Sequence, residues 1–350
     1  MKNKSNIFLN KFYRPDRFLK PVRSVIIITL LLFFSCNNPK EKQEIITKIP
    51  VIVEETNISI PDFNSDSAYY FVKKQVDFGP RVPNTKPHKQ CSEYLVSKLK
   101  SFNFTVTVQE GEVYTFNNSK LNLNNIIAAY KPEATDRILL FAHWDTRPFA
   151  DQDTKDKNFP IDGASDGASG VAVLLEVARQ INLSNPTIGI DIIFFDAEDF
   201  GQPDGSMTER QSDTYCLGSQ YWARHPHKAN YRPRFGILLD MVGGKNATFT
   251  KEGTSLNYAP SVARKVWAAA KKIGYSNYFS TKSTDWITDD HLYINKIAKI
   301  PSIDIIQYDE STRSNFAAYW HTHNDNMSAI DAATLKAVGQ TLLEVIYREK

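Results

Sequence analysis

The sequence predicts an α/β fold in three layers (an αβα sandwich), with helices on both faces of a mainly parallel, mixed central sheet. Two observations predict it. Apolar runs with the character of strands alternate along the chain with segments of helical periodicity. At least one run, 138–142 (ILLFA), has no polar face, which is typical of a strand covered on both sides. The 42% hydrophobic content allows a sizeable core and excludes a disordered or fibrous chain.

The first half of this pattern begins with two helices. The cap-like Asn64 predicts a helix start for 65–76, and Pro87 is expected in the first turn of a second helix. The run 104–108 (FTVTV) alternates as a half-buried strand does. Two further strands are expected over 125–130 and 137–142.

The second half continues the alternation. We expect a helix from Gly170, because apolar residues follow it at helical spacing. The remaining predicted strands are 188–195, 235–239 and 303–306, and the remaining predicted helices are 261–273 and 332–348. In such sheets, sites form beyond the carboxyl ends of the strands.

The N-terminus has the composition of an export signal. A basic stretch precedes the apolar run 25–34 (VIIITLLLFF), which is too short to span a bilayer and suits a signal peptide. The run ends in Ser35-Cys36, as in a bacterial lipoprotein, so Cys36 is the expected lipidation site. We therefore expect a signal peptide over 1–35, a lipidated, polar tether over 36–62 and one catalytic domain over 63–350. The protein would be exported and held by its lipid on the bacterial cell envelope, facing the periplasm.

The charge gives no indication of a polyanionic partner. The first 23 residues hold seven basic residues and one acidic residue, and the rest of the chain has 35 basic and 38 acidic residues. A nucleic-acid-binding domain is normally far more basic, so we expect no nucleic acid as partner. Cys91 and Cys216 are far apart in sequence, and a disulfide between them stays open.

Acidic and histidine residues gather at the ends of predicted strands and in nearby loops. They are His143, Asp145, Asp166, Glu198, Asp199, Asp240, Asp289, Asp290, His291 and His321. Buried charges at strand ends are costly unless they are paired or bind a metal. Zinc suits such a set, because nitrogen and oxygen ligands in a catalytic site leave one position open. The adjacent Glu198 and Asp199 could divide the roles of general base and ligand. Among the other histidines, His88 lies near a helix start and is expected on the surface.

The order of these motifs resembles the zinc aminopeptidase-like superfamily. The motifs are H-x-D after a strand, DGASDGASG, FFDAED, LLDMVG, DDH and WHT, and they cover the chain from about Ser65 to its end. Within this superfamily the chain is most similar to the animal-type glutaminyl-peptide cyclotransferases, because of Trp320, Asp289-Asp290-His291 and LLDMVG.

The resemblance implies roles for individual residues. One zinc would be bound by Asp166, Asp199 and His321, and Glu198 would be the general acid and base. Asp240 and Asp289 would help to bind the substrate amine, and Trp320 would line the glutamine pocket. His143 and Asp145 match a motif whose histidine binds a second zinc in the peptidases. Asp304 stands where animal cyclases have a histidine, and Asp199 where many relatives have glutamate.

Three functions follow as hypotheses. The first is cyclisation of the N-terminal glutamine of peptides to pyroglutamate, with one zinc and with loss of ammonia. The second is a zinc aminopeptidase with two ions, because the same residues could activate a metal-bound water. The third, a binding domain without activity, is disfavoured by the complete ligand set. The polar segment 200–214 does not match the animal pattern, and we expect it to form a pocket wall.

Overall fold

The computed structural model describes residues 59–203 and 205–349, which belong to one unit spanning Thr56–Lys350. The predicted signal peptide and Cys36 lie outside the described residues, as does most of the tether. Within the described part of the chain, none of the helices is both long enough and apolar enough to cross a membrane.

A six-stranded mixed sheet forms the centre, in the order β1-β2-β4-β3-β5-β8. Four neighbouring strands, β4, β3, β5 and β8, run parallel, whereas β2 is antiparallel to both of its neighbours. The strands are β1 (Thr105–Tyr114), β2 (Lys120–Tyr130), β3 (Arg137–His143), β4 (Gly189–Phe195), β5 (Gly236–Asp240) and β8 (Ser302–Ile306). A separate parallel pair joins β6 (Phe249–Lys251) to β7 (Phe279–Ser283). The mixed, mainly parallel sheet was therefore predicted correctly.

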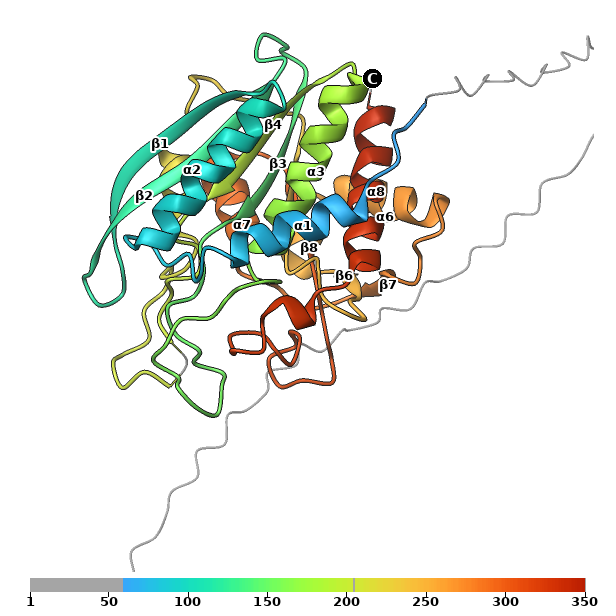
Figure 1. The fold of residues 1–350 in the computed structure, drawn as a ribbon. Helices are drawn as coiled ribbons and strands as arrows, with labels where there is room; N and C mark the ends of the chain where they lie inside the picture. The colour runs from blue at the N-terminus through green and yellow to red at the C-terminus, as the bar shows by residue number, and fades with distance from the viewer. Residues whose placement is uncertain (1–58, 204, 350) are drawn as a thin grey trace, which may run out of the picture. The chain divides into compact units, whose positions relative to one another are not determined.

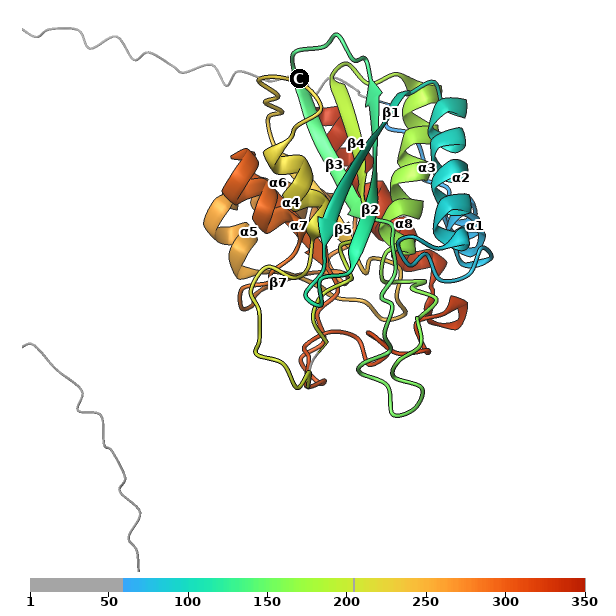
Figure 2. The same ribbon diagram turned by 90° about the vertical axis from the view of Figure 1, so that its left-hand side faces the viewer.

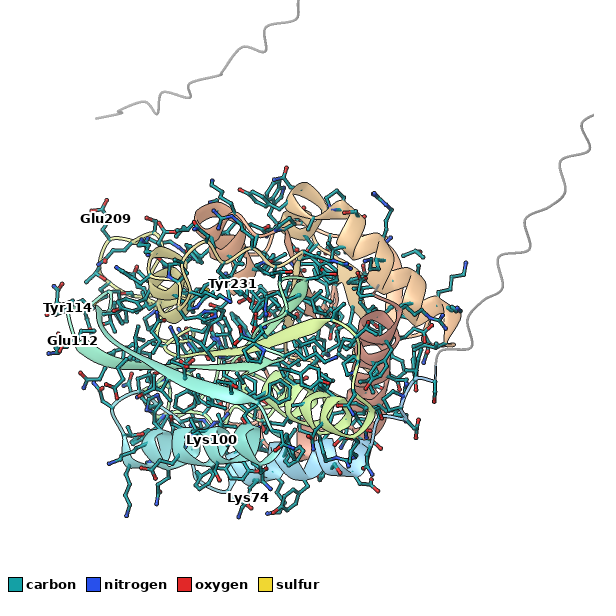
Figure 3. The ribbon with its side chains drawn as sticks, turned by 90° about the horizontal axis from the view of Figure 1, so that it is seen from above. Lys74, Lys100, Glu112, Tyr114, Glu209 and Tyr231 are labelled. Carbon is teal, nitrogen blue, oxygen red and sulfur yellow. The ribbon has the colours of Figure 1, made fainter. Side chains whose placement is uncertain are left out.

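Helices cover both faces of this sheet, as Figures 1 and 2 show. One layer contains α1 (Ser65–Val76), α2 (Lys86–Ser101), α3 (Ala168–Ser184) and α8 (Ala332–Arg348). The other contains α4 (Leu217–Arg224), α7 (Asp290–Tyr293) and the π-helical turn η1 (Ile294–Ala298). The remaining helices are α5 (Gly253–Tyr258), α6 (Pro260–Lys272) and the 3-10 turn η2 (Met327–Ala329). Seen from above in Figure 3, Lys74 and Lys100 mark the outer side of the α1–α2 layer, and Glu209 lies on the other side of the sheet.

Alternating side chains of the same strands fill the two cores. On β3, Ile138 and Leu140 pack toward α3 and α8, whereas Leu139 and Phe141 pack with Trp222 of α4. This double burial is why 138–142 reads as a continuous apolar run. The sheet is therefore fixed on both sides, and its strand ends hold their side chains in defined positions.

The predicted elements differ from the observed ones mainly at their ends. Strand β2 begins five residues earlier than expected, because Lys120–Asn124 pairs with β1 although it is polar. Helix α3 begins at Ala168, two residues before Gly170. The short elements α5, α7, β6 and β7 were not predicted, since none is long enough to show a periodic pattern.

The expectation that His88 lies on the surface was wrong. His88 is buried in α2, where its ring stacks on Trp144 at a centroid distance of 4.2 Å. Its Nε2 lies 2.8 Å from Oδ1 of Asp196, the residue that follows β4. His88 is the third residue of α2. The sequence alone suggests that such a position is exposed, but in the fold it faces the end of the sheet.

Candidate active site

The site lies at one end of the sheet, where the parallel strands have their carboxyl ends. His143 is the last residue of β3 and Asp240 the last residue of β5, whereas Asp196 directly follows β4. The loops after these strands gather at this end, which is the lower end in Figures 1 and 2. The strand ends therefore bring together residues that are up to about a hundred positions apart.

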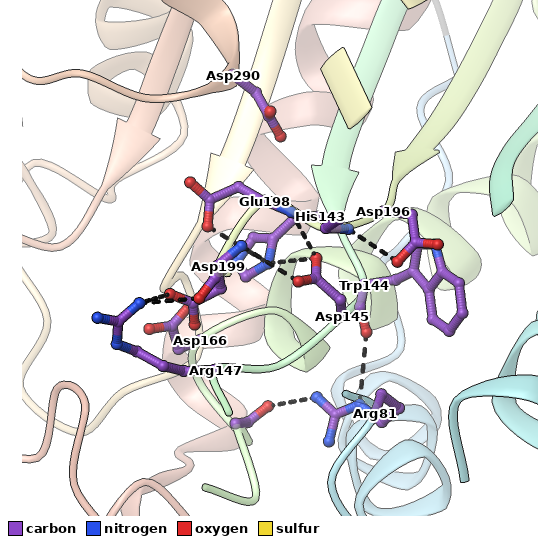
Figure 4. Close-up of polar contacts among 12 residues, drawn as sticks. Arg81, His143, Trp144, Asp145, Arg147, Asp166, Asp196, Glu198, Asp199 and Asp290 are labelled. Carbon is purple, nitrogen blue, oxygen red and sulfur yellow. Dashed lines mark hydrogen bonds and ion pairs between the residues drawn. The ribbon is translucent and has the colours of Figure 1, made fainter. Parts of the chain in front are cut away.

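The turn after β4 carries the adjacent carboxylates, and Asp145 fixes it. The backbone N–H groups of Glu198 and Asp199 donate to Oδ1 and Oδ2 of Asp145, at 3.0 and 3.2 Å (Figure 4). Ala197, just before them, has a left-handed φ of 52°. Because both oxygens of Asp145 accept from the backbone, the structure makes it an anchor for this turn.

The loop before α3 positions Asp166 in the site. The small residues of this loop allow its backbone to approach neighbouring segments closely. A Cβ on Gly167, whose φ is 94°, would lie 2.6 Å from the backbone oxygen of Asp145 and 3.2 Å from the His143 ring. The N–H groups of Ser165 and Asp166 donate to Oδ1 and Oδ2 of Asp325, at 2.7 and 3.0 Å. The glycine is therefore needed for close approach of the chain, beyond the needs of a simple turn.

His321 faces Asp166 and Asp199 through one nitrogen. Its Nε2 lies 3.2 Å from Oδ1 of Asp199 and 3.7 Å from Oδ2 of Asp166. Its other nitrogen, Nδ1, lies 3.3 Å from Oδ1 of Asp151. Arg147 in turn donates to both oxygens of Asp151, at 2.7 and 3.0 Å. A carboxylate on the far nitrogen of a histidine is the usual way to orient a metal ligand.

Asp166, Asp199 and His321 have the geometry of a zinc site. One ligand atom from each lies within 4.8 Å of those of the other two, and all three residues are buried. Oδ2 of Asp199 is buried without any hydrogen-bond partner. Two carboxylates and one imidazole match the three protein ligands of a catalytic zinc with an open position. The residues therefore fit the ion that the sequence predicts.

A second group of possible ligands adjoins the first. His143 Nε2 lies 3.1 Å from Oδ1 of Asp166 and 3.1 Å from Oδ1 of Asp240. The three residues form a buried cluster that shares Asp166 with the first group. The geometry is compatible both with a histidine N–H shared by two carboxylates and with a second ion. The number of ions thus stays a prediction.

Glu198 stands beside these groups with the character of a general acid or base. Its carboxylate is nearly buried, and Oε2 lies 4.0 Å from Nδ1 of His143. Burial raises the pKa of Glu198 well above its usual value, and the neighbouring Asp199 and Asp289 carboxylates raise it further. A raised carboxyl pKa suits a group that takes up and returns a proton near neutral pH.

Two more acids predicted for the site lie next to it. Asp240 and Asp289 both line the pocket, and burial raises their pKa values to about 6 and about 7. Asp304, on β8, is fully buried, and burial together with Asp289 and Asp240 raises its pKa well above the usual range. Asp304 is thus a buried acid at the position where the resemblance implies a histidine.

A pocket of about 750 Å³ opens over this group of residues. Trp320 lines it and stacks on the His321 ring at a centroid distance of 3.7 Å. The pocket lining also includes much of the segment between Gln202 and Tyr215. The prediction that the polar segment 200–214 forms a pocket wall is thereby confirmed.

Sequence reasoning missed the residues that hold the ligands in place. They are Arg147, Asp151, Asp196, Cys216 and Asp325. Asp196 stands within the FFDAED motif, although no role was assigned to it, and no short spacing identifies the others. Asp325 and Cys216 contact residues of other segments. Arg147 contacts Asp151 of its own loop and the backbone oxygen of Asp199.

Comparison with known proteins agrees with this geometry. The model of peptidase family M28 matches residues 125–346, which include every site residue named above except His88. The chain belongs to peptidase family M28. Among solved structures, this M28 protein is 55% identical to a Bacteroides thetaiotaomicron glutaminyl cyclase bound to N-acetylhistamine. The similarity covers 83% of the chain and 100% of that protein, with a TM-score of 0.82.

Two other relatives of this M28 protein differ in name. A structure described as a leucine aminopeptidase precursor, also from Bacteroides thetaiotaomicron, is 55% identical over 84% of the chain and 100% of its own length, with a TM-score of 0.81. A glutaminyl-peptide cyclotransferase of Drosophila melanogaster is 24% identical over 73% of each chain. Both activities considered from the sequence therefore occur among the names of its relatives.

Proposed function

We propose that this protein is a zinc-dependent glutaminyl-peptide cyclotransferase, which converts the N-terminal glutamine of peptides and proteins to pyroglutamate and releases ammonia. The observation that carries the proposal is the similarity to a bacterial glutaminyl cyclase, at 55% identity over the whole length of that protein and 83% of this chain. The site supports it, because Glu198 and the Asp166–Asp199–His321 group face one pocket with Trp320 in its wall. Peptide N-termini are accordingly the partners that it acts on.

In the reaction, the α-nitrogen of the glutamine attacks the side-chain amide carbon. The new C–N bond closes the ring, the bond to the amide nitrogen breaks, and ammonia leaves. Asp166, Asp199 and His321 would hold the zinc, whose positive charge would stabilise the negative charge that develops on the amide oxygen.

Glu198 moves the protons of this reaction. Its carboxylate accepts a proton from the attacking α-amine and returns it to the departing nitrogen, so that no water is consumed. Its raised pKa serves both steps, since the group has to hold the proton between them.

The other pocket residues bind and orient the substrate. Asp240 and Asp289 provide acidic groups for the α-amine, and both lie on the pocket surface with Glu198. Trp320, held against the His321 ring, gives the glutamine side chain an apolar wall that excludes water. The pocket wall formed by the segment between Gln202 and Tyr215 would contact the substrate residues that follow the glutamine.

An aminopeptidase is the second candidate, and one observation favours it. The His143–Asp166–Asp240 cluster could hold a second ion, as the aminopeptidase alternative requires. One tightly bound zinc per chain is expected for the cyclase and two for the aminopeptidase. Metal analysis after dialysis distinguishes them.

The decisive experiment measures ammonia from a short peptide that begins with glutamine, and free leucine from one that begins with leucine. We expect ammonia without chain cleavage, and a loss of at least a hundredfold in kcat for Glu198→Gln, the lower end for removal of a general base. Glu209→Gln makes the same chemical change at an exposed position of the pocket-wall segment and should retain the wild-type rate. Free leucine without ammonia would reject the cyclase in favour of the aminopeptidase.

We propose further that the enzyme is exported and anchored to the bacterial cell envelope by a lipid on Cys36, facing the periplasm. The basic stretch, the apolar run 25–34 and Ser35-Cys36 support this. In bacteria fed labelled palmitate, the wild-type protein should be labelled and sediment with membranes. The Cys36→Ser variant should carry no label and should not sediment with membranes, whereas Cys91→Ser should behave as wild type. Equal labelling of all three proteins would reject the lipid anchor.

A further inference from the structure

Cys216 lies directly behind the proposed general base. It precedes α4 and is fully buried, with a left-handed φ of 59°. Its backbone N–H donates to the carbonyl oxygen of Glu198 at 2.8 Å, and the N–H of Leu217 donates to that of Ala197 at 3.1 Å. The start of α4 is therefore bound to the turn that carries Glu198.

The Cys216 side chain makes a second contact with Glu198. Its Sγ donates to Oε1 of Glu198 at a distance of 3.1 Å, which is short for a sulfur donor. Oε2 lies 4.0 Å from Nδ1 of His143, which is beyond hydrogen-bond distance. The thiol thus occupies one oxygen and leaves Oε2 for the substrate.

A thiol at this position keeps its proton. Burial raises the pKa of Cys216 well above its usual value, and the carboxylates of Glu198, Asp290 and Asp289 raise it further. Because a thiol is a weak donor, it fixes the orientation of a carboxylate without strongly stabilising the charge. The thiol contact thereby holds the Glu198 carboxylate in place.

We infer that Cys216 is a positioning residue for the cyclisation, and that its thiol holds Oε1 of Glu198 so that Oε2 faces the substrate α-amine. This inference rests on the proposed function, because it assigns Glu198 to proton transfer. Neither the sequence motifs nor the similarity to relatives assigns Cys216 a role. The backbone bonds of Cys216 position the turn, whereas the thiol positions the carboxylate itself.

The test compares variants of the zinc-loaded full chain by ammonia release from a glutaminyl peptide. We expect Cys216→Ala to lower kcat roughly tenfold, with KM changed less than twofold, because one hydrogen bond to the base is lost. Cys216→Ser keeps a donor and should recover to within about threefold of wild type. Cys91→Ala removes the other buried thiol, which lies in α2, and should keep the wild-type kcat.

Two kinetic outcomes would overturn the inference. One is a wild-type kcat in Cys216→Ala, and the other is a Cys216→Ser variant as slow as Cys216→Ala. If wild-type protein releases no ammonia, the proposed function fails instead. The two failures are thus distinguishable.

An infrared measurement tests the contact between the thiol and the carboxylate independently of enzyme activity. It does not use Cys216→Ala and therefore applies even if that variant does not fold. The S–H stretching band of Cys216 is identified as the band lost in Cys216→Ser. We expect it at lower frequency than the Cys91 band, and we expect it to rise when Glu198→Leu removes the acceptor. A band unmoved by Glu198→Leu would show that the thiol does not bind the carboxylate.

Discussion

At the scale of single residues, the site depends on carboxylates that accept from the backbone. Asp145 accepts hydrogen bonds from the N–H groups of Glu198 and Asp199. Asp325 accepts hydrogen bonds from those of Ser165 and Asp166. Each fixes, through the main chain, a residue that is proposed as a metal ligand. The ligands are thus placed before any ion binds, which is the requirement for a precise metal site.

Asp145→Asn tests this anchoring. An amide offers one acceptor oxygen where the backbone presents two donors, so one buried N–H loses its partner. We expect the free energy of unfolding to fall by about 2 kcal/mol, and kcat to fall because Glu198 and Asp199 shift. Urea unfolding and ammonia release measure the two effects.

The matched control is Asp156→Asn, which makes the same change at an exposed position of the same loop region and should be neutral. Equal stability of the two variants would show that Asp145 does not anchor the turn.

At the scale of elements, helix α2 supports the active-site turn from behind. His88 of α2 contacts Asp196, and Asp196 accepts from the backbone N–H groups of Asn124 and Ala197, each at 2.8 Å. Strand β2, the turn after β4 and α2 therefore meet at one buried carboxylate. The left-handed Ala197 is stabilised by this junction.

His88→Ala removes the contribution of α2 to that junction. It leaves Oδ1 of Asp196 without the imidazole and opens space beside Trp144, so we expect a loss of about 2 kcal/mol in unfolding free energy. Lys89→Ala, at an exposed position of the same helix, should change stability by less than ~0.5 kcal/mol. Urea denaturation with far-UV circular dichroism measures both; indistinguishable midpoints would refute the role of His88.

At the scale of the whole molecule, the proposed zinc site would link folding to ion binding. Asp166 and Asp199 are both buried and face one another across the His321 ring edge, so their charges repel unless a cation lies between them. A cation that binds only the folded state also stabilises it by mass action.

Removal of zinc should therefore lower the melting temperature. With free zinc at a hundred times Kd, binding contributes ~2.7 kcal/mol. For a folded unit that spans Thr56–Lys350, this corresponds to a shift of roughly 4–5 °C. Thermal unfolding with and without a chelator measures it. Asp199→Asn should have a lower melting temperature with zinc and lose most of the chelator effect. An unchanged shift in that variant would place the ion elsewhere.

Much of the site was predictable because the strand ends are visible in the sequence. An apolar run followed by His143, Glu198 or Asp240 identifies a carboxyl end, and parallel strands bring such ends together. Asp151 and Asp325 were not predictable, since each lies in a loop whose path depends on the residues that it binds. His88 was misjudged because a helix start has no fixed exposure until the helix is packed.

The sequence by itself determined the alternation of strands and helices, the mixed αβα architecture and the residue types of the metal centre. The architecture follows from local periodicity, and the residue types of the metal centre follow from the chemistry of individual side chains. Only the tertiary structure decided which oxygen of Asp145 accepts from which N–H, and that Cys216 and His88 lie behind the catalytic turn. Such contacts join segments that are distant in sequence, and their geometry is set by how the helices pack on the sheet.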